Sequence, residues 1–363
     1  MLGFKQSIVD RRVYYLVGKG KGELIVIGVF VDDNWYMHTS AAFFKTCFYV
    51  EFETRFEVAP DADVTGNEFC GAVFEIDRES KTAQISAPGI VDRLEVALQQ
   101  FAGSHPQTRS LSTPMFEDVP KMIQAKAAPE DLMPVQFVSH ARSLLGIGGW
   151  VAVQVRPEIF FAFVVLSQQI VINLSKACWE AVLQWARHLV AHRNYKLTFS
   201  GMGLQEDFEF FVDSSLINGP DAGSLGGYVG CFPRSGAFAW RTLCHRSAVD
   251  SSMGAELLFA VTAGKAVLGW RMLARELEQA SRGPTTLHID ASAVLGALER
   301  NVVTRESRFL AARLAMLREM TQLALVAKKI ATGDNIADAM TKALKEADFV
   351  RHRENLGVLP SPL

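Results

Sequence analysis

Cysteine is scarce in this sequence: five cysteines lie far apart along a chain of 363 residues. No two of them form a CxxC pair, the spacing on which zinc ribbons are built. Their dispersion also argues against a disulfide framework and favours a reducing compartment. The scarcity of cysteine thus excludes two common ways of holding a small extracellular domain together.

Long uninterrupted apolar runs are also missing. The longest apolar region, residues 150–172, is broken by Gln154, Arg156, Pro157 and Glu158, whereas a bilayer-spanning helix needs about 20 predominantly apolar residues in succession. The opening segment, MLGFKQSIVDRR, has no apolar core long enough for a signal peptide. We therefore expect an intracellular protein, cytoplasmic or nuclear, with no signal peptide, transmembrane helix or membrane partner.

The sequence also lacks a strong excess of positive or negative charge. The formal net charge is -2, and 49% of the residues are hydrophobic against 21% charged. This balance favours globular cores over disorder. It gives no global electrostatic reason to bind nucleic acid, so any such partner must meet local basic patches. The length predicts two or three compact units.

The first part of the chain has an α+β pattern. Residues 11–18, 22–33 and 68–88 alternate or run apolar as strands do, the last as a hairpin turning near 78–81. Apolar spacing predicts helices over 40–54 and 89–101. Residues 102–122, rich in Pro, Ser and Thr, are expected to form a linker.

Helical patterns then fill residues 134–200. From residue 204 the pattern changes to three short strands (208–213, 225–232 and 236–243), a long helix from Asp250 or Ser251 to about Leu277, and then alternating strands and helices. The order βββαβα(α)βα predicts a mixed sheet with helices packed against it.

Four acidic residues in this last part occupy places that are unusual for structural residues. Asp213 ends the strand FEFFVD, and Asp290 ends TTLHID at the carboxyl edge of the sheet, where open α/β sheets bind ligands. Glu256 lies on an apolar stripe of the long helix, and Asp338 follows the turn Gly333–Asn335 in the first turn of the last helix. Taken singly, each has a structural alternative, as a strand end, an N-cap or a helix-dipole acid.

A carboxylate that faces a core must be protonated, paired or bound to a metal. If the four converge, their hard oxygen ligands suit Mg²⁺ or Mn²⁺. Two such ions about 3.5–4 Å apart can flank a phosphodiester, one generating the attacking hydroxide and the other stabilising the leaving oxygen.

This order of elements and carboxylates resembles the ribonuclease H fold. The segments FFVDSSLINGPDAGSLGGYVG, AVDSSMGAELLFAVTAGKAVLGWRMLARELE, TTLHIDASAVLGAL and IATGDNIADAMTKAL are similar to the corresponding segments of copia-type retrotransposon Pol polyproteins. The resemblance implies that the metal-binding and catalytic residues are Asp213, Glu256, Asp290 and Asp338. It implies two-metal hydrolysis of the RNA strand in an RNA–DNA hybrid, leaving 3′-hydroxyl and 5′-phosphate ends.

The word GVFVDD, with Asp32 and Asp33, resembles the end of a reverse transcriptase palm. The aspartate pair has two explanations: half of a polymerase metal site, or a solvated hairpin turn. Only Asp10 and Glu23 precede it as acidic residues, and the third palm aspartate and the fingers are missing. We therefore expect no polymerase activity from this chain alone, and favour the turn.

Two basic clusters are candidates for contacting phosphates. One contains Arg187, Arg193 and Lys196, and the other contains Arg305 and Arg308; solvated helix faces are the alternative explanation for both. Near the second, Phe309, Leu310 and Ala311 stand where many relatives carry His-Ile-Asp, a change expected to weaken substrate grip or metal positioning without removing a metal ligand.

The resemblance divides the chain into a truncated reverse transcriptase palm and thumb (1–115), a helical connection (116–203), a ribonuclease H-like domain with a five-stranded mixed sheet (204–345) and a C-terminal tail (346–363). The leading hypothesis is a ribonuclease H acting on an RNA–DNA hybrid. The alternatives are a catalytically silent remnant that binds nucleic acid or serves a structural role, and a polymerase subunit completed by a separately encoded remainder of Pol.

Overall fold

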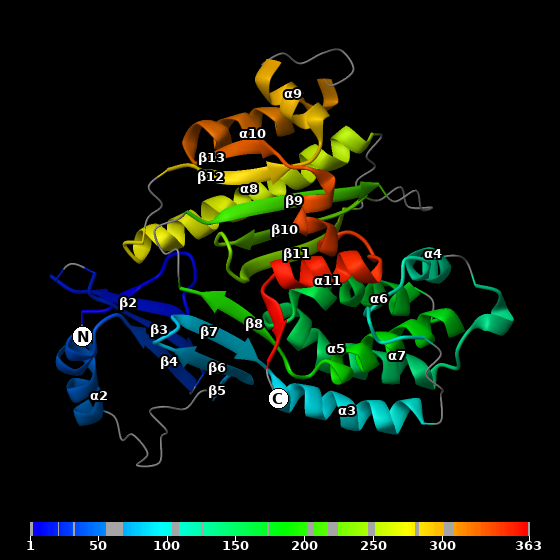
Figure 1. Ribbon diagram of the computed structural model, residues 1–363, viewed down its shortest axis with the longest axis horizontal. Helices are drawn as coiled ribbons and strands as arrows, with labels where there is room; N and C mark the ends of the chain where they lie inside the picture. Colours follow the sequence, from blue (N-terminus) through cyan, green and yellow to red (C-terminus); the bar gives the residue numbers. More distant parts are fainter. Residues whose placement is uncertain are drawn as a thin grey trace.

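The computed structural model describes residues 3–20, 22–31, 33–55, 68–103, 109–124, 127–172, 174–201, 207–216, 224–245, 251–279, 283–300 and 308–361. Asp32 and Arg305 lie outside these residues. Figure 1 shows a mixed sheet with its helices in the upper half, two antiparallel sheets at the lower left and a helical group at the lower right.

The first sheet is antiparallel in the order β1-β2-β3-β4. Its strands are β1 (Lys5–Gln6), β2 (Val13–Val17), β3 (Leu24–Phe30) and β4 (Asp33–His38). The apolar run that forms β3 is hydrogen-bonded on both sides, and Ile25 and Ile27 point into a small core with Phe44 and Phe48. Those rings come from the predicted helix near 40–54, which is α1 (Ala41–Phe44), the π-helical η1 (Lys45–Tyr49) and α2 (Val50–Arg55).

The second sheet has the order β14-β8-β7-β6-β5, antiparallel throughout. Its strands are β5 (Glu68–Phe69), β6 (Ala72–Asp77), β7 (Thr82–Ser86), β8 (Tyr195–Ser200) and β14 (Val358–Pro360). The β6–β7 hairpin confirms the turn predicted near 78–81. The sheet also combines strands from three of the segments into which the sequence was divided, although the boundaries themselves stay a prediction.

The strand β8 corrects the expectation that residues 134–200 are helical throughout. Its residues, YKLTFS, include the aromatic residues Tyr195 and Phe199 and a β-branched threonine, which suit a pleated surface. The strand is fixed by β7 on one side and β14 on the other. Both partners are distant in sequence, so a local helical pattern upstream could not reveal it.

The helical group is built from the predicted helices. It contains α3 (Pro88–Ala102), η2 (Pro129–Asp131), α5 (Gln136–Gln154), η3 (Pro157–Ile159), α6 (Phe160–Ile172) and α7 (Lys176–Ala191). Close packing of α5 on α7 depends on Gly148, because a Cβ at that position would come within 2.6 Å of the Trp185 ring.

The segment predicted as a linker is packed in its described part. Residues 119–124 form α4 (Val119–Gln124), and Met115 and Ile123 are buried. From α7, Gln184 Nε2 donates to the carbonyls of Ser110 (2.7 Å) and Thr113 (3.0 Å). These bonds satisfy a backbone that has no strand or helix partner of its own, which a composition rich in Pro, Ser and Thr does not indicate.

The third sheet has the order β11-β10-β9-β12-β13. Its strands are β9 (Glu209–Leu216), β10 (Ser224–Cys231), β11 (Ala237–His245), β12 (Thr285–Ile289) and β13 (Leu325–Lys329). The first three pair antiparallel, and β12 pairs parallel with both β9 and β13. This confirms the predicted five-stranded mixed sheet.

Helices cover both faces of this sheet. On one face lie α8 (Ser252–Glu276), α9 (Ser292–Arg300), η4 (Arg308–Leu310) and α10 (Ala311–Leu323). The alternation of β9 divides its side chains: Phe210 and Val212 join the core under α8, whereas Phe211 joins the core of the helical group. The chain then continues through η5 (Thr332–Asp334), η6 (Ile336–Met340) and α11 (Glu346–Asn355) to β14.

Among the described residues, α8 alone is long and apolar enough to be a candidate membrane span by length and composition. It packs against β9 and β10 and contributes Leu257, Phe259 and Val267 to the core, all at most 1% exposed. These contacts are typical of the core helix of a folded domain.

Candidate metal centre

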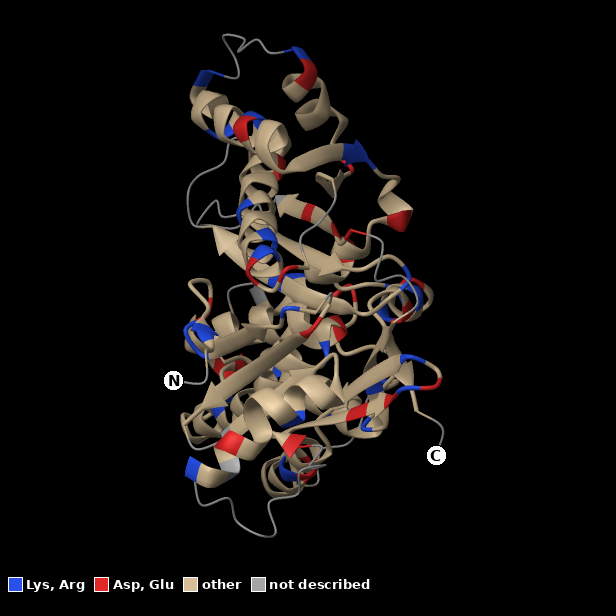
Figure 2. Ribbon diagram, turned by 90° about the vertical axis from the view of Figure 1, so that its left-hand side faces the viewer, with Lys and Arg blue, Asp and Glu red and all other residues tan. Residues whose placement is uncertain are grey.

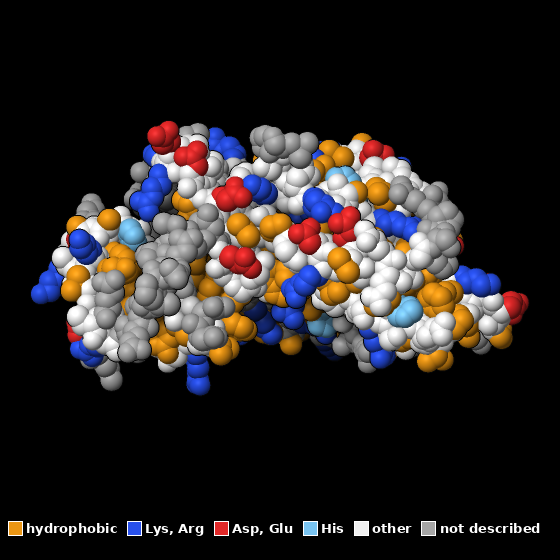
Figure 3. Space-filling view, turned by 90° about the horizontal axis from the view of Figure 1, so that it is seen from below, with side chains coloured by type: hydrophobic (Ala, Val, Ile, Leu, Met, Phe, Trp, Pro, Cys, Tyr) orange, Lys and Arg blue, Asp and Glu red, His pale blue; other side chains and the backbone are white. Residues whose placement is uncertain are grey.

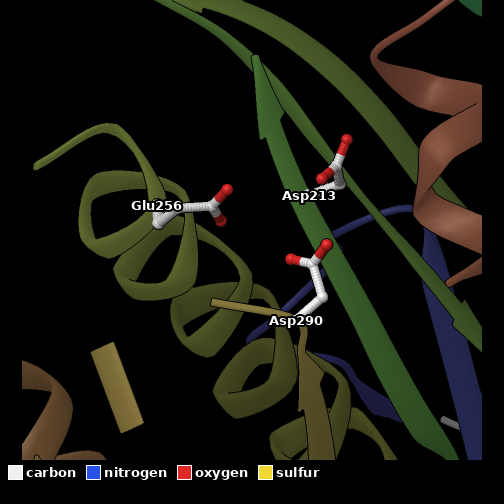
Figure 4. A group of neighbouring side chains, drawn as sticks. All are labelled: Asp213, Glu256 and Asp290. Carbon is white, nitrogen blue, oxygen red and sulfur yellow. The ribbon is translucent and has the colours of Figure 1, made fainter. Parts of the chain in front are cut away.

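Three of the four predicted carboxylates meet at the carboxyl end of β12. Asp290 follows this strand directly, whereas Asp213 lies within β9, which continues to Leu216 and corrects the expectation that Asp213 ends its strand. Ligand oxygens of Asp213, Glu256 and Asp290 all lie within 4.8 Å of one another, and the three side chains point toward one another in Figure 4. In the parallel register of β9 and β12, Val212 lies opposite Ile289. The next residue along each chain is an aspartate, so this register places Asp213 beside Asp290. The helix α8, capped by Ser251, packs on β9 and supplies Glu256.

Asp213 is the most enclosed of the three, with 2% of the residue exposed. Thr341 Oγ1 donates to its Oδ2, and Lys342 Nζ lies 3.4 Å from the same oxygen. Burial raises the pKa of Asp213 to about 6, helped by the nearby Asp338 carboxylate and opposed by Lys342 and Thr341. The carboxyl group therefore favours its protonated form more than a free aspartate does.

The environment of Glu256 is still less suited to a free carboxylate. Burial, together with the charges of Asp213 and Asp290, raises the pKa of Glu256 to about 8, although a hydrogen bond from Ser214 opposes this. Among the described residues, Glu256 Oε2 and Asp290 Oδ1 have no hydrogen-bond partner and are shielded from solvent. Buried carboxylate oxygens without a partner are destabilising unless a ligand binds them.

Asp290 is held at the edge of this group by the segment after β13. Thr332 Oγ1 donates to its Oδ2 (3.3 Å), and Lys329 Nζ donates to its backbone carbonyl. The second oxygen, Oδ1, is left facing the cluster without a partner. A divalent cation fits this donor set, because hard cations prefer several carboxylate oxygens.

Asp338 lies beside the cluster rather than within it. It belongs to the 3-10 helix η6, which is a correction to its predicted place in the last helix, since α11 begins only at Glu346. Lys342 Nζ lies 2.9 Å from Asp338 Oδ1 and bridges it to Asp213. Burial alone would lower the pKa of Lys342, but the two carboxylates outweigh this and raise it, so the amine stays charged.

Asn335 is a site residue that the sequence interpretation missed. It is fully buried, and its Nδ2 donates to the carbonyl of Val212 (2.9 Å), directly before Asp213. Its Oδ1 accepts from the amide of Ala337 and caps η6. The asparagine therefore fixes η6 to β9, and a polar residue just before an apolar run is the signal of such a cap.

Asp33, the described member of the aspartate pair, belongs to another sheet. Phe30 and Asp33 are paired across β3 and β4, and Val31 has the positive φ of 57° that tight turns use. The backbone thus reverses at this point, as the hairpin explanation of the pair expects. Asp32 itself lies outside the described residues.

Two of the candidate nucleic-acid contacts are engaged in ion pairs. Arg193 binds Asp92 (3.1 Å) and Glu95 (2.6 Å), and Lys196 binds Glu75 (2.7 Å). Burial lowers the pKa of Arg187, which lines a small cavity beside α4 and α7. Arg308, in η4, is exposed.

The surface has no single-sign field in the views available. Acidic and basic residues are scattered along the ribbon in Figure 2, and the lower face in Figure 3 mixes both signs with apolar groups. This agrees with a net charge of -2 and leaves nucleic-acid attraction to local groups such as Lys329 and Lys342 beside the acidic cluster.

Comparison with known proteins identifies one informative likeness. No protein-family model matches the chain. The chain is 23% identical over 291 residues to the retrovirus-related Pol polyprotein from transposon TNT 1-94 of Nicotiana tabacum, a match covering 78% of this chain and 21% of that protein. The chain thus spans about a fifth of the length of this relative.

Solved structures give weaker likenesses. LC11-RNase H1 in complex with an RNA/DNA hybrid is 12% identical, covering 37% of this chain and 93% of that one, with a TM-score of 0.30. RNase H1 of Halobacterium salinarum NRC-1 is 16% identical, covering 37% and 92%, also at 0.30. The foamy viral protease-reverse transcriptase in complex with dsDNA is 16% identical, covering 38% and 94%, at 0.30. TM-scores this low support no inference about the present chain.

The sequence likeness, by contrast, extends across most of the chain. A match over 291 residues exceeds any one part of the fold. The chain is therefore similar over most of its length to a retrotransposon Pol polyprotein, which confirms the resemblance predicted from its sequence.

Proposed function

We propose that this protein is a ribonuclease H-type endonuclease that hydrolyses the RNA strand of an RNA–DNA hybrid. The observation that carries the proposal is the convergence of Asp213, Glu256 and Asp290 within 4.8 Å, with two of their buried oxygens unpartnered. Three carboxylates this close together repel one another when ionised, so such a cluster indicates a functional site. Metal-assisted hydrolysis of a phosphodiester is a function that requires such carboxylates.

The residues present fit Mg²⁺ or Mn²⁺. Asp213, Glu256 and Asp290 would hold the cation, which when bound supplies Lewis-acid stabilisation of the phosphodiester and an activated water. The enclosure of Asp213 fixes the direction of its oxygens through Thr341, and the cap by Ser251 fixes the start of the helix that carries Glu256. The protein's part is thus to hold a preorganised set of acceptors.

Positive side chains at the rim complete the site. The ammonium groups of Lys329 and Lys342 lie next to Asp290 and Asp213 respectively, where they can attract the phosphates that flank a scissile bond. Preference for a hybrid would follow from 2′-hydroxyls on one strand in a shallow minor groove, with DNA-like geometry in the other.

We also propose that residues 1–115, 116–203, 204–345 and 346–363 correspond to a truncated palm, a connection, the nuclease domain and a tail. The hairpin at Phe30 and Asp33 and the likeness to the Pol polyprotein support this division. In this proposal Asp32 and Asp33 are a polymerase remnant. Because β14 and β8 share a sheet with β7, the segments would be parts of one folded body.

The test is cleavage of a labelled RNA–DNA hybrid by the purified chain in Mg²⁺. We expect cleavage by the wild type and at least a roughly 100-fold loss in Asp213→Asn, about 2.7 kcal/mol in transition-state stabilisation. Asp131→Asn, the same change at an exposed site in η2 of the helical group, is the matched control and should cleave like the wild type.

Absence of cleavage by the wild type would contradict the proposal and favour a silent remnant. Equal cleavage by the wild type and Asp213→Asn would point to a contaminating nuclease and would likewise remove the claim.

A further inference from the structure

The four acidic residues near the mixed sheet fall into two groups with different neighbours. Asp213, Glu256 and Asp290 form the close cluster. Asp338 instead shares a cation with Asp213, since Lys342 Nζ lies 2.9 Å from Asp338 Oδ1 and 3.4 Å from Asp213 Oδ2. Within the described residues, one side of Asp213 therefore faces unpartnered oxygens and the other faces an ammonium group.

The position of Lys342 is set by a backbone that is anchored at several points. Asn335 Nδ2 donates to Val212 in β9, and Thr242 Oγ1 in β11 donates to the carbonyl of Met340 (2.7 Å). The amide of Lys342 donates to the carbonyl of Asp338 (3.0 Å). The lysine is thus one helical turn beyond Asp338 on a segment fastened to the sheet.

Moving the Lys342 ammonium group away from this position costs free energy. Its side chain is 37% exposed, whereas those of Asp213 and Asp338 are 3% and 11% exposed. Withdrawing the lysine would leave two buried carboxylates facing each other without a cation, an arrangement that is strongly unfavourable. A divalent ion entering the same place would have to displace the ammonium or lie beside a like charge.

We propose that Lys342 occupies the place of a second cation, so that the protein free of nucleic acid binds one divalent ion, at Asp213, Glu256 and Asp290. The inference rests on the metal centre of the proposed function and specifies it. Lys342 is here a positioning residue, which neutralises Asp338 and one side of Asp213 and leaves the other side to the ion. It differs from the expectation from the sequence that two ions bind.

The test counts ions and needs no catalysis. The purified chain, without nucleic acid, is titrated with Mn²⁺, and the free ion is followed by electron paramagnetic resonance. We expect one bound ion in the wild type and a second in Lys342→Met, at an affinity at least tenfold above any second site of the wild type.

Two further variants keep the test decisive. Lys345→Met, the same substitution at an exposed position three residues on, should bind one ion. Lys342→Arg keeps the positive charge and should also bind one, which provides a folded comparison if Lys342→Met does not fold.

The outcomes separate this inference from the nuclease proposal. Two equally tight ions in the wild type, or a single ion in a folded Lys342→Met, would overturn the role of Lys342 and leave the nuclease proposal intact. If no ion binds to the wild type, both are overturned.

Discussion

Two clusters of charge are removed from solvent in this molecule, and they are balanced differently. In the helical group, Arg156 and Glu158 are 2% and 0% exposed in their side chains and form an ion pair, with Arg156 Nε donating to Glu158 Oε1 (2.5 Å). Arg156 Nη1 also donates to the carbonyl of His192 (2.9 Å), and its guanidinium lies over the Tyr195 ring. Positive and negative charge are matched there.

At the mixed sheet the charges are not matched. Oxygens of three carboxylates lie within 4.8 Å of one another, and the ammonium group of Lys342 is shared between Asp213 and Asp338. The pKa values of Asp213 and Glu256 are raised to about 6 and about 8, chiefly because burial disfavours their charged forms. In the described part of the chain, Glu158 also has an oxygen, Oε2, without a hydrogen-bond partner, so an unpartnered oxygen alone does not distinguish the two clusters. The difference is that Glu158 has a counter-charge, whereas the carboxylates at the mixed sheet outnumber theirs, and such an excess indicates a binding site.

The largest effect is expected from breaking the matched cluster. Glu158→Gln leaves the Arg156 guanidinium buried without its counter-charge, so we expect a loss of about 3–5 kcal/mol in the free energy of unfolding. Urea denaturation followed by circular dichroism measures it.

The control for that change removes both charges. Arg156→Met with Glu158→Leu should regain most of the stability, because a buried pair can often be replaced by apolar groups of similar size. If the double variant is as unstable as Glu158→Gln, the loss of stability does not come from an unmatched charge. That result would contradict the account given for the Arg156–Glu158 pair.

The next effect is expected from pH at the unmatched cluster, where it is spread over several pH units. Between its ordinary pKa of 4.5 and its folded value of about 8, Glu256 is protonated in the folded chain and ionised in the unfolded chain. Its contribution to stability is therefore present below pH 4.5 and is lost as the pH rises toward 8. Without metal, the free energy of unfolding should fall by on the order of 1 kcal/mol per pH unit in this window.

Asp213 adds to this slope in its lower part, between its ordinary pKa of 3.8 and about 6. Denaturation at several pH values in a chelator measures the slope, and Glu256→Gln should flatten it and make the metal-free protein more stable near pH 8. A slope that is unchanged in Glu256→Gln would show that this carboxyl group is not the source. Excess Mg²⁺ should offset the loss at high pH, since the ion binds the ionised form.

The smallest effect is expected at an exposed, matched cluster. Arg193 pairs with Asp92 and Glu95 at the surface, so Arg193→Ala should change the free energy of unfolding by less than about 1 kcal/mol. Because these pairs already engage the guanidinium, hybrid cleavage should be unchanged. Thermal unfolding and the cleavage assay check both, and a large drop in hybrid affinity would instead support the predicted phosphate contact.

Much of the fold could be predicted from the sequence because its signals are local. Ser251 and the apolar periodicity after it predicted α8, and the run FEFFVD predicted the strand that carries Asp213, although β9 continues past this residue to Leu216. The change from three hairpin-like strands to alternating strands and helices predicted a mixed sheet. Apolar strands that run into an aspartate and an apolar helix face were enough to select Asp213, Glu256 and Asp290, since an acid in such a place needs a partner.

Only the tertiary structure determined the features that depend on partners distant in sequence. The strand β8 exists through pairing with β7 and β14, as in the bond between Gln84 and Thr198, 114 residues apart, and no local pattern encodes such a pair. Asp338 and Asp213 are likewise far apart in sequence, so only the fold could bring them to a common lysine. The sequence determined which residues carry charge into the interior, and the tertiary structure decided which of those charges are neutralised by the protein itself.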